Sequence, residues 1–160
     1  MPRLEVGDSA PDVPFHDDGR QRSLGELWAG GPVVLFFYPK DGTPVCTKQA
    51  CRLRDVHNTF GRAGATVIGV SGDSDRRHRR FAADHQLPFT LVSDRDATLR
   101  RAFGVSKTIG LFPGRETFVI DRHGVVRYVF RGQFDLTSHV DAALRVVERL
   151  SEPTDAEVET

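Results

Sequence analysis

Apolar residues along the chain follow two patterns. Short, nearly continuous apolar runs are typical of buried strands, and they predict strands over residues 33–38, 66–71, 87–92, 116–120 and 125–130. Segments whose apolar residues recur every three or four positions predict helices over residues 45–60, 74–85, 94–103 and 136–150, the second capped by Asp73 or Ser74. Residues 4–28 are expected to hold only short strands and one capped helical turn at residues 23–28.

The order of these elements predicts the fold class. Strand, helix, strand, helix and strand, followed by a hairpin and a closing helix, indicate an α/β fold with a central mixed sheet flanked by helices. That order fits a thioredoxin-like fold. With 160 residues, the chain is expected to form one domain over residues 1–150. An acidic tail, residues 151–160, is expected to be disordered.

Composition and charge narrow the function. Lys plus Arg and Asp plus Glu each number 22, so no net charge favours nucleic acid or a membrane. The basic segment at residues 76–80 is expected to be a solvated helix face, and the histidines show no pairing. The N-terminus has no apolar signal core, so we expect a cytoplasmic location. Two cysteines in a chain of this size indicate a reactive pair rather than a structural bridge.

The first of these cysteines, Cys46, is predicted to lie at the start of a helix that leaves a buried strand. Thr43 can cap that helix, and Pro44 suits its first position, where no N–H is needed. Unpaired backbone N–H groups and the positive end of the helix dipole gather there. A thiol in that position is expected to ionise more readily than a free one.

Residues 38–51 carry the pattern Pro-x-x-x-Thr-x-x-Cys, which resembles the active-site motif of the peroxiredoxins. The longer string through Cys51 resembles the Q subfamily, also called bacterioferritin comigratory proteins, and the resemblance covers roughly residues 4–149. It implies the same fold, with an N-terminal hairpin extension. It also implies that Cys46 is the peroxidatic cysteine, that Cys51 resolves it, and that Arg115, just before a Thr-Phe strand, supplies a cation.

The spacing of the two cysteines constrains any bond between them. Five helical steps separate their Cα atoms by about 8 to 9 Å and rotate them by about 140°. A disulfide rarely spans more than about 7 Å between Cα atoms. Cys46 and Cys51 could therefore bond only if the first turns of the helix unwind. The spacing also disfavours dithiol exchange of the Cys-x-x-Cys type and, without a matching histidine, a zinc site.

A low thiol pKa alone does not make a fast peroxidase. It raises the thiolate fraction, but the intrinsic nucleophilicity of the thiolate falls with it. The site must therefore also stabilise the charge that moves onto the leaving peroxide oxygen. The Thr43 hydroxyl and the N–H groups of Val45 and Cys46 are candidate donors. Pro39 would shield the thiolate, the Val45 side chain would narrow the pocket mouth, and Phe112 is placed towards the substrate.

These patterns predict a thiol peroxidase for hydrogen peroxide and organic hydroperoxides, without metal or bound cofactor. The resemblance implies reduction by thioredoxin or a similar protein. We expect a monomer that binds neither nucleic acid nor a membrane. Two alternatives stay open at this point: a protein disulfide oxidoreductase, and a redox-sensing thiol module that changes partners when its helix unwinds.

Overall fold

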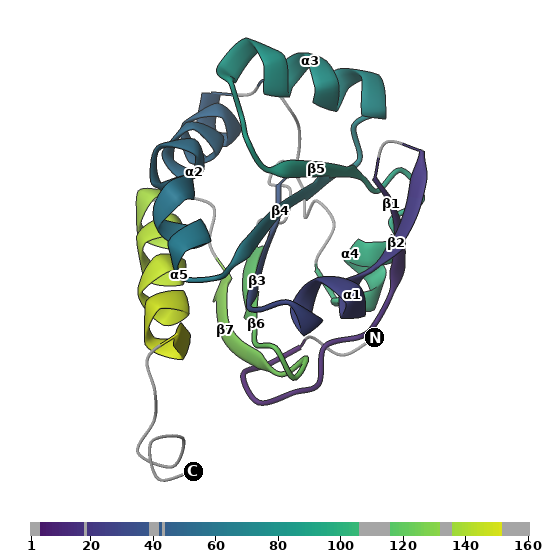
Figure 1. The fold of residues 1–160 in the computed structure, drawn as a ribbon. Coiled ribbons are helices and arrows are strands. Elements are labelled where there is room, and N and C mark those ends of the chain that lie inside the picture. The colour runs from purple at the N-terminus through teal and green to yellow at the C-terminus, as the bar shows by residue number, and fades with distance from the viewer. Residues whose placement is uncertain are drawn as a thin grey trace, which may run out of the picture.

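A five-stranded mixed sheet forms the middle layer of the protein (Figure 1). The computed structural model describes residues 4–17, 19–38, 42, 44–105, 116–131 and 136–151. The strand order is β5-β4-β3-β6-β7, with bounds β3 (Val33–Phe37), β4 (Thr66–Ser71), β5 (Thr90–Ser93), β6 (Glu116–Ile120) and β7 (Val126–Arg131). β3, β4 and β5 run parallel, whereas β6 pairs antiparallel with both β3 and β7. The predicted mixed sheet is confirmed.

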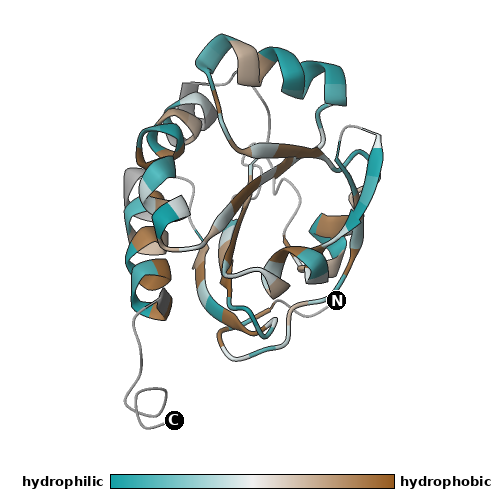
Figure 2. Cartoon of the chain, viewed as in Figure 1, coloured by the Kyte–Doolittle hydropathy of each residue, from teal (hydrophilic) through white to brown (hydrophobic). Residues whose placement is uncertain are grey.

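The central strand β3 is buried along its whole length, as its apolar run predicts. Alternate side chains of a strand point to opposite faces, so β3 contributes to two cores. Leu35 and Phe37 belong to one core, together with Phe103 and Phe118. Val34 and Phe36 belong to the other. The strands accordingly form the apolar middle of the molecule in Figure 2.

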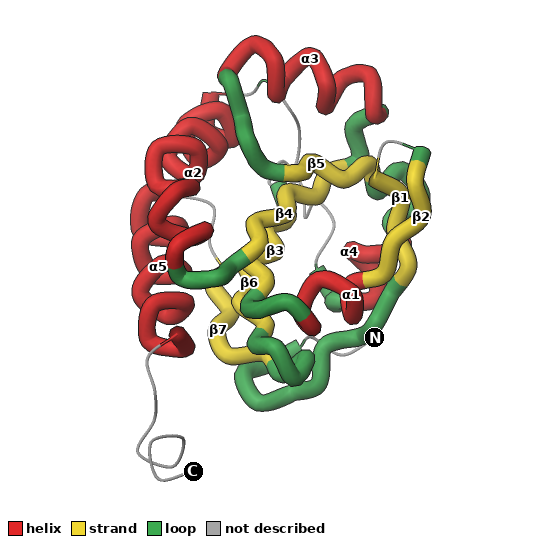
Figure 3. Tube along the Cα trace, viewed as in Figure 1, coloured by secondary structure: helices red, strands yellow, loops and turns green. Residues whose placement is uncertain are grey.

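Helices cover both faces of this sheet (Figure 3). Three helices supply apolar residues to the core that holds Val34: α2 (Pro44–Arg62), α3 (Asp75–His85) and α5 (Leu136–Ser151). The other face is covered by two short helices and a hairpin: α1 (Leu24–Ala29), α4 (Thr98–Ala102), β1 (Pro14–Asp17) and β2 (Arg20–Ser23). This three-layer arrangement confirms the predicted thioredoxin-like fold with an N-terminal hairpin.

Side-chain caps set several helix starts. Ser23 caps α1 and Ser74 caps α3, so Ser74 rather than Asp73 has the capping role on α3. The carboxylate of Asp94 accepts hydrogen bonds from the backbone N–H groups of Leu99 and Arg100, at 2.9 and 3.0 Å. Because Asp94 caps from a distance in this way, α4 is shorter than the helix predicted from residue 94.

Two further boundaries differ from the prediction. β5 begins at Thr90 rather than at residue 87, because Pro88 lacks the N–H that a ladder requires. α5 ends at Ser151, the first residue of the predicted tail, and residues 152–160 lie outside the described residues. The division into one domain over residues 1–150 and a tail therefore stays a prediction.

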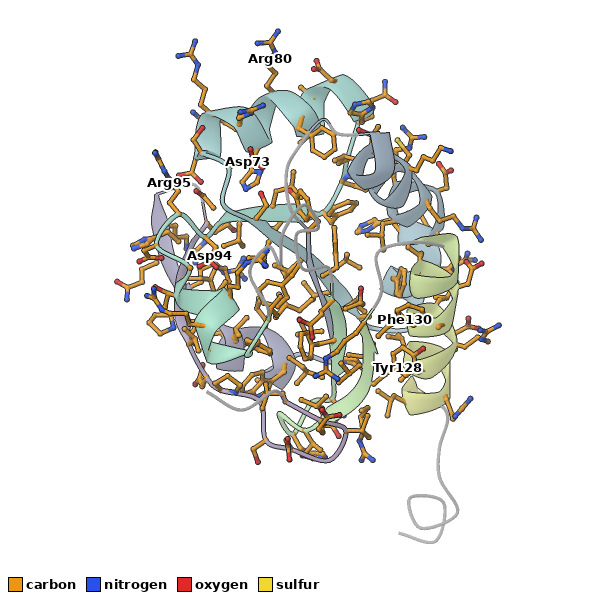
Figure 4. The ribbon with its side chains drawn as sticks, turned by 180° about the vertical axis from the view of Figure 1, so that it is seen from behind. Asp73, Arg80, Asp94, Arg95, Tyr128 and Phe130 are labelled. Atoms are coloured by element: carbon orange, nitrogen blue, oxygen red, sulfur yellow. The ribbon has the colours of Figure 1, made fainter. Side chains whose placement is uncertain are left out.

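The arginine-rich segment of α3 is a solvated face, as predicted, except for His78. The side chain of Arg80 points away from the body of the protein (Figure 4), and the other arginines of residues 76–80 are also exposed. His78 is instead buried, with Nε2 3.0 Å from the carbonyl oxygen of Val92. It lies three residues before Phe81, on the same helix face, and that face packs on the sheet. No helix of the described part of the chain is long and apolar enough to cross a membrane.

Candidate active site

The backbone around Cys46 has the predicted architecture. β3 ends at Phe37, and the N–H of the buried Tyr38 donates to the carbonyl oxygen of Val70 at 3.0 Å. Helix α2 then begins at Pro44, so Cys46 lies in its first turn. The first N–H groups of a helix have no intrahelical acceptor, and they carry the positive end of the dipole. The position can therefore favour an anion.

Several predicted site residues cannot be compared with the structure. Pro39, Thr43, Phe112 and Arg115 lie outside the described residues, and so do the side chains of Val45 and Cys46. Their assigned roles stay predictions.

Cys51 lies one and a half turns further along α2, and its sulfur is not in a disulfide. Its half-buried side chain faces α3, where the sulfur is 3.9 Å from Nδ1 of His85. Sequence reasoning found no partner for any histidine and missed this contact. The only available signal was the position of His85 at the end of its predicted helix.

The sheet register brings the end of β3 to the start of β6. Phe37, two residues before Pro39 in the chain, pairs with Glu116, which directly follows Arg115. Strand β6 therefore enters the sheet beside the point where the chain leaves β3 for the cysteine helix. Two segments 79 residues apart in sequence, at Phe37 and Glu116, therefore meet at one end of the sheet.

Buried charges lie at this edge. Glu116 is 3% exposed, and its Oε1 accepts a hydrogen bond from Nε of Arg131 at 2.6 Å. Burial lowers the pKa of Arg100, although the carboxylates of Asp94 and Glu116 oppose that shift. The Arg100 guanidinium lies 6.0 Å from the centre of the Phe37 ring. Glu116 thus provides negative charge between two arginines at the entry to β6.

The described residues include no group of three or more His, Cys, Asp or Glu side chains that could hold a metal ion. The chemistry that the described side chains can support is that of the Cys51 thiol, the His85 imidazole and partly buried guanidinium groups.

Comparison with known proteins identifies the family. The AhpC/TSA family matches residues 6–129. The chain belongs to this family. It is 46% identical over 150 residues to "Peroxiredoxin Q, chloroplastic" of Sedum lineare, covering 92% of this chain and 80% of that protein. It is 43% identical over 148 residues to the Arabidopsis thaliana protein of the same name, covering 91% and 68%.

Solved structures agree with this assignment. Peroxidoxin BcpB of Mycobacterium tuberculosis superposes with a TM-score of 0.85 at 37% identity, covering 92% of this chain and 98% of that one. The bacterioferritin comigratory protein of Xanthomonas campestris, whose structures concern alkyl peroxide reduction, gives 0.81 at 33% identity, covering 93% and 98%. The chain is therefore a peroxidase of the peroxiredoxin Q and bacterioferritin comigratory type, and the predicted family is confirmed.

The predicted cytoplasmic location is contradicted by the same comparison. The plant relatives are named chloroplastic, which points to the plastid rather than the cytoplasm for those proteins. The prediction rested on the missing apolar signal core. That criterion detects secretory signals, but it does not detect transit peptides, which are amphipathic and rich in Arg and Ser.

Proposed function

We propose that the chain reduces hydrogen peroxide and small organic hydroperoxides through Cys46 and Cys51. The Cys46 thiolate attacks one peroxide oxygen, and the O–O bond breaks. This yields a Cys46 sulfenic acid and, after protonation, water or an alcohol. Cys51 then displaces the sulfenic hydroxyl as water, which forms an intrachain disulfide. Thioredoxin or a similar dithiol protein reduces that disulfide, so the enzyme turns over without metal or organic cofactor.

The observation that carries this proposal is the position of Cys46 in the first turn of α2, directly after the buried strand β3. Backbone N–H groups there can stabilise both the thiolate and negative charge on the leaving oxygen. The rest of the motif supplies further donors. Thr43 would hydrogen-bond the peroxide together with the N–H of Val45, and Pro39 would exclude water from the thiolate.

Arg115 is proposed as the cation that polarises the peroxide. The pairing of Phe37 with Glu116 supports this role, because Arg115 directly precedes Glu116 in the chain. The ion pair of the buried Glu116 with Arg131 stabilises the start of β6, directly after Arg115 in the chain. Phe112 would provide an apolar wall for the organic part of a hydroperoxide.

Disulfide formation requires a second conformation of α2. In the reduced protein, α2 is helical through Cys46 and Cys51, so their Cα atoms are about 8 to 9 Å apart, beyond disulfide range. The turns between them must open before the sulfurs can bond. We further propose that residues 1–150 act as a single monomeric domain.

Intact mass spectrometry tests this assignment. Fully reduced protein receives one equivalent of hydrogen peroxide, and Cys51→Ser is treated in parallel. Loss of two hydrogens in the wild type, with gain of one oxygen in the variant, is expected from attack by Cys46 and resolution by Cys51. An unchanged wild-type mass would refute the catalytic assignment of both cysteines.

A further inference from the structure

The Cys51 thiol has a basic partner on a different helix. Its sulfur lies 3.9 Å from Nδ1 of His85, the last residue of α3, and both side chains are half-buried. We propose that His85 is the general base that accepts the Cys51 proton when this thiol attacks the oxidised Cys46. The inference rests on the proposed function, because it requires Cys51 to be the resolving thiol.

One neighbour contacts the imidazole of His85, and another contacts its backbone. The Phe81 ring, one turn earlier on α3, packs against it edge to face, with ring centres 5.0 Å apart. The Arg54 guanidinium of α2 donates to the backbone carbonyl oxygen of His85 at 2.7 Å. Cys51 and Arg54 are three residues apart, so they share one face of α2 and meet the same residue. The two contacts fix the end of α3 beside Cys51, where Nδ1 lies 3.9 Å from the sulfur.

Charge around the pair suits proton transfer. A neutral imidazole with its proton on Nε2 leaves Nδ1 free to accept one. His85 is the last residue of α3, so it lies at the negative end of the helix dipole. From α2, the charged group that contacts His85 is Arg54, and the Asp55 carboxylate at 3.2 Å partly offsets its charge. The proposed base therefore has the negative end of the α3 dipole and the paired charges of Arg54 and Asp55 around it.

The proposed step balances as follows. The Cys51 S–H bond breaks and its proton moves to Nδ1 of His85. The sulfur of Cys51 attacks the sulfur of the Cys46 sulfenic acid, the S–S bond forms, and the S–O bond breaks. The hydroxide that leaves takes the proton back from His85 and departs as water. The sulfenic sulfur is reduced and the Cys51 sulfur is oxidised, so no other reductant or oxidant is needed.

The arrangement remains usable when α2 opens. Arg54 lies on the part of α2 that follows Cys51. This part is anchored in the core by Phe60, which is fully buried. Unwinding of the turns before Cys51 therefore leaves the Arg54 contact with His85 in place. His85 therefore stays tied to α2 next to Cys51, and the proton can leave Cys51 before its thiol moves towards Cys46.

Timed alkylation after one equivalent of peroxide tests the role in the full-length protein. His85→Gln is compared with wild type and with His123→Gln, which alters an exposed histidine in the β6–β7 turn. Free thiols are capped at intervals, and disulfide is counted by mass. We expect His85→Gln to form disulfide about tenfold more slowly near pH 7, less than the usual general-base effect of about 100-fold or more because the contact is long. The difference in rate between His85→Gln and wild type should close at alkaline pH, because hydroxide can then accept the proton in place of His85.

Two results would overturn the proposal. One is an unchanged rate of disulfide formation in His85→Gln near pH 7. The other is a slowing that is the same at every pH, which would indicate a structural contact only. Wild-type protein that forms no disulfide would reject the resolving role of Cys51 itself. Normal disulfide formation with no dependence on His85 would reject only the base.

A second measurement needs no change at His85. In Cys46→Ser, Cys51 is the sole thiol, and its rate of alkylation by iodoacetamide can be followed against pH. Assistance by His85 predicts an inflection in the range where an imidazole titrates, in addition to that of the thiol. A profile with one inflection, that of a thiol alone, would count against the base.

Discussion

Arg54 of α2 donates a hydrogen bond to the backbone carbonyl oxygen of His85 at 2.7 Å, one turn beyond Cys51. The last carbonyl groups of a helix lack intrahelical donors, so this bond satisfies a group that the end of α3 leaves unpaired. It also ties α2 to α3 at a defined place. Any opening of α2 that brings Cys51 to Cys46 should therefore stop near Arg54.

Hydrogen exchange can locate that boundary. In the oxidised protein, amides of residues 45–53 should exchange much faster than in the reduced protein, because a Cys46–Cys51 bond excludes the intact helix. Residues 58–62 should keep their protection, because their N–H groups donate to carbonyls beyond the opened segment. Arg54→Met should extend the fast region towards Phe60, whereas Arg62→Met, an exposed change in the last turn, should not. Equal protection of residues 45–53 in both redox states would contradict helix opening.

Replacing Glu116 with Gln should destabilise the protein. Glu116 is buried against Arg131, and its charge also acts on Arg100, so its neutralisation removes the most buried carboxylate from both arginines and leaves them the exposed Glu5 and the carboxylate of Asp94. We expect a loss of about 1 to 3 kcal/mol in the free energy of unfolding by urea titration. Glu5→Gln is a matched control, since Glu5 faces the same Arg131 but is 64% exposed, and it should change stability by less than about 1 kcal/mol. Equal losses of stability in Glu116→Gln and Glu5→Gln would mean that the burial of Glu116 does not contribute to stability.

Ionised Asp121 should stabilise the folded protein at neutral pH, and this stabilisation should be lost at low pH. Burial alone would raise the pKa of its carboxyl. Hydrogen bonds from Arg127 at 2.7 Å and from the N–H groups of Val125 and His123 lower the pKa by more than burial raises it, so the pKa is depressed overall. A carboxyl whose pKa is depressed in the folded state stabilises the protein when the pH is above the pKa of the unfolded state, near 4. This stabilisation is lost as the pH falls through the pKa of the folded state.

Asp121→Asn should therefore cost about 1 to 2 kcal/mol near neutral pH, with the difference from wild type narrowing below about pH 4. Urea titrations across that range measure it. Arg122→Gln changes an exposed residue of the same turn and should leave the pH dependence intact. A deficit in Asp121→Asn that persists unchanged at low pH would exclude the linkage.

Gly124 should tolerate no side chain. Its φ is +78°, and an added Cβ would lie 3.0 Å from two atoms of the Trp28 indole. We expect Gly124→Ala to lose about 1 to 3 kcal/mol and to shift the fluorescence of Trp28, the sole tryptophan. Gly19→Ala separates the backbone strain from the contact with Trp28. Gly19 has a φ of +86°, but in the described part of the chain no atom beyond its two chain neighbours lies within 4 Å of an added Cβ. If both variants lose the same stability, the Trp28 contact contributes nothing.

The sequence predicts most of the elements because their signals are local. The apolar run of β3, the Ser74 cap of α3 and the Asp121 turn each depend on neighbouring residues. The burial of His78 was not predicted, because the polar residues around it suggested an exposed helix face. Its position three residues before Phe81 places it on the face that packs on the core.

Contacts across the fold could not be predicted in this way. His85 meets Cys51 only because α3 and α2 pack on the same face of the sheet. Glu116 meets Arg131 through the pairing of β6 with β7, whose register shifts near Ile120. Both require the strand order, which a single sequence does not reveal. Cys46 was identified from sequence because its motif is contiguous.

The packing of α2 against α5 has a consequence for synthesis on the ribosome. Arg52 of α2 pairs with Asp141 of α5 at 2.9 Å, and Leu53 shares a core with Val147. A nascent chain therefore carries both cysteines for about 90 residues of translation before the helix that covers α2 exists. At about 5 to 20 residues per second, this interval lasts roughly 5 to 20 s. During that time the thiols depend on the cell, rather than on the fold, for protection from unwanted oxidation.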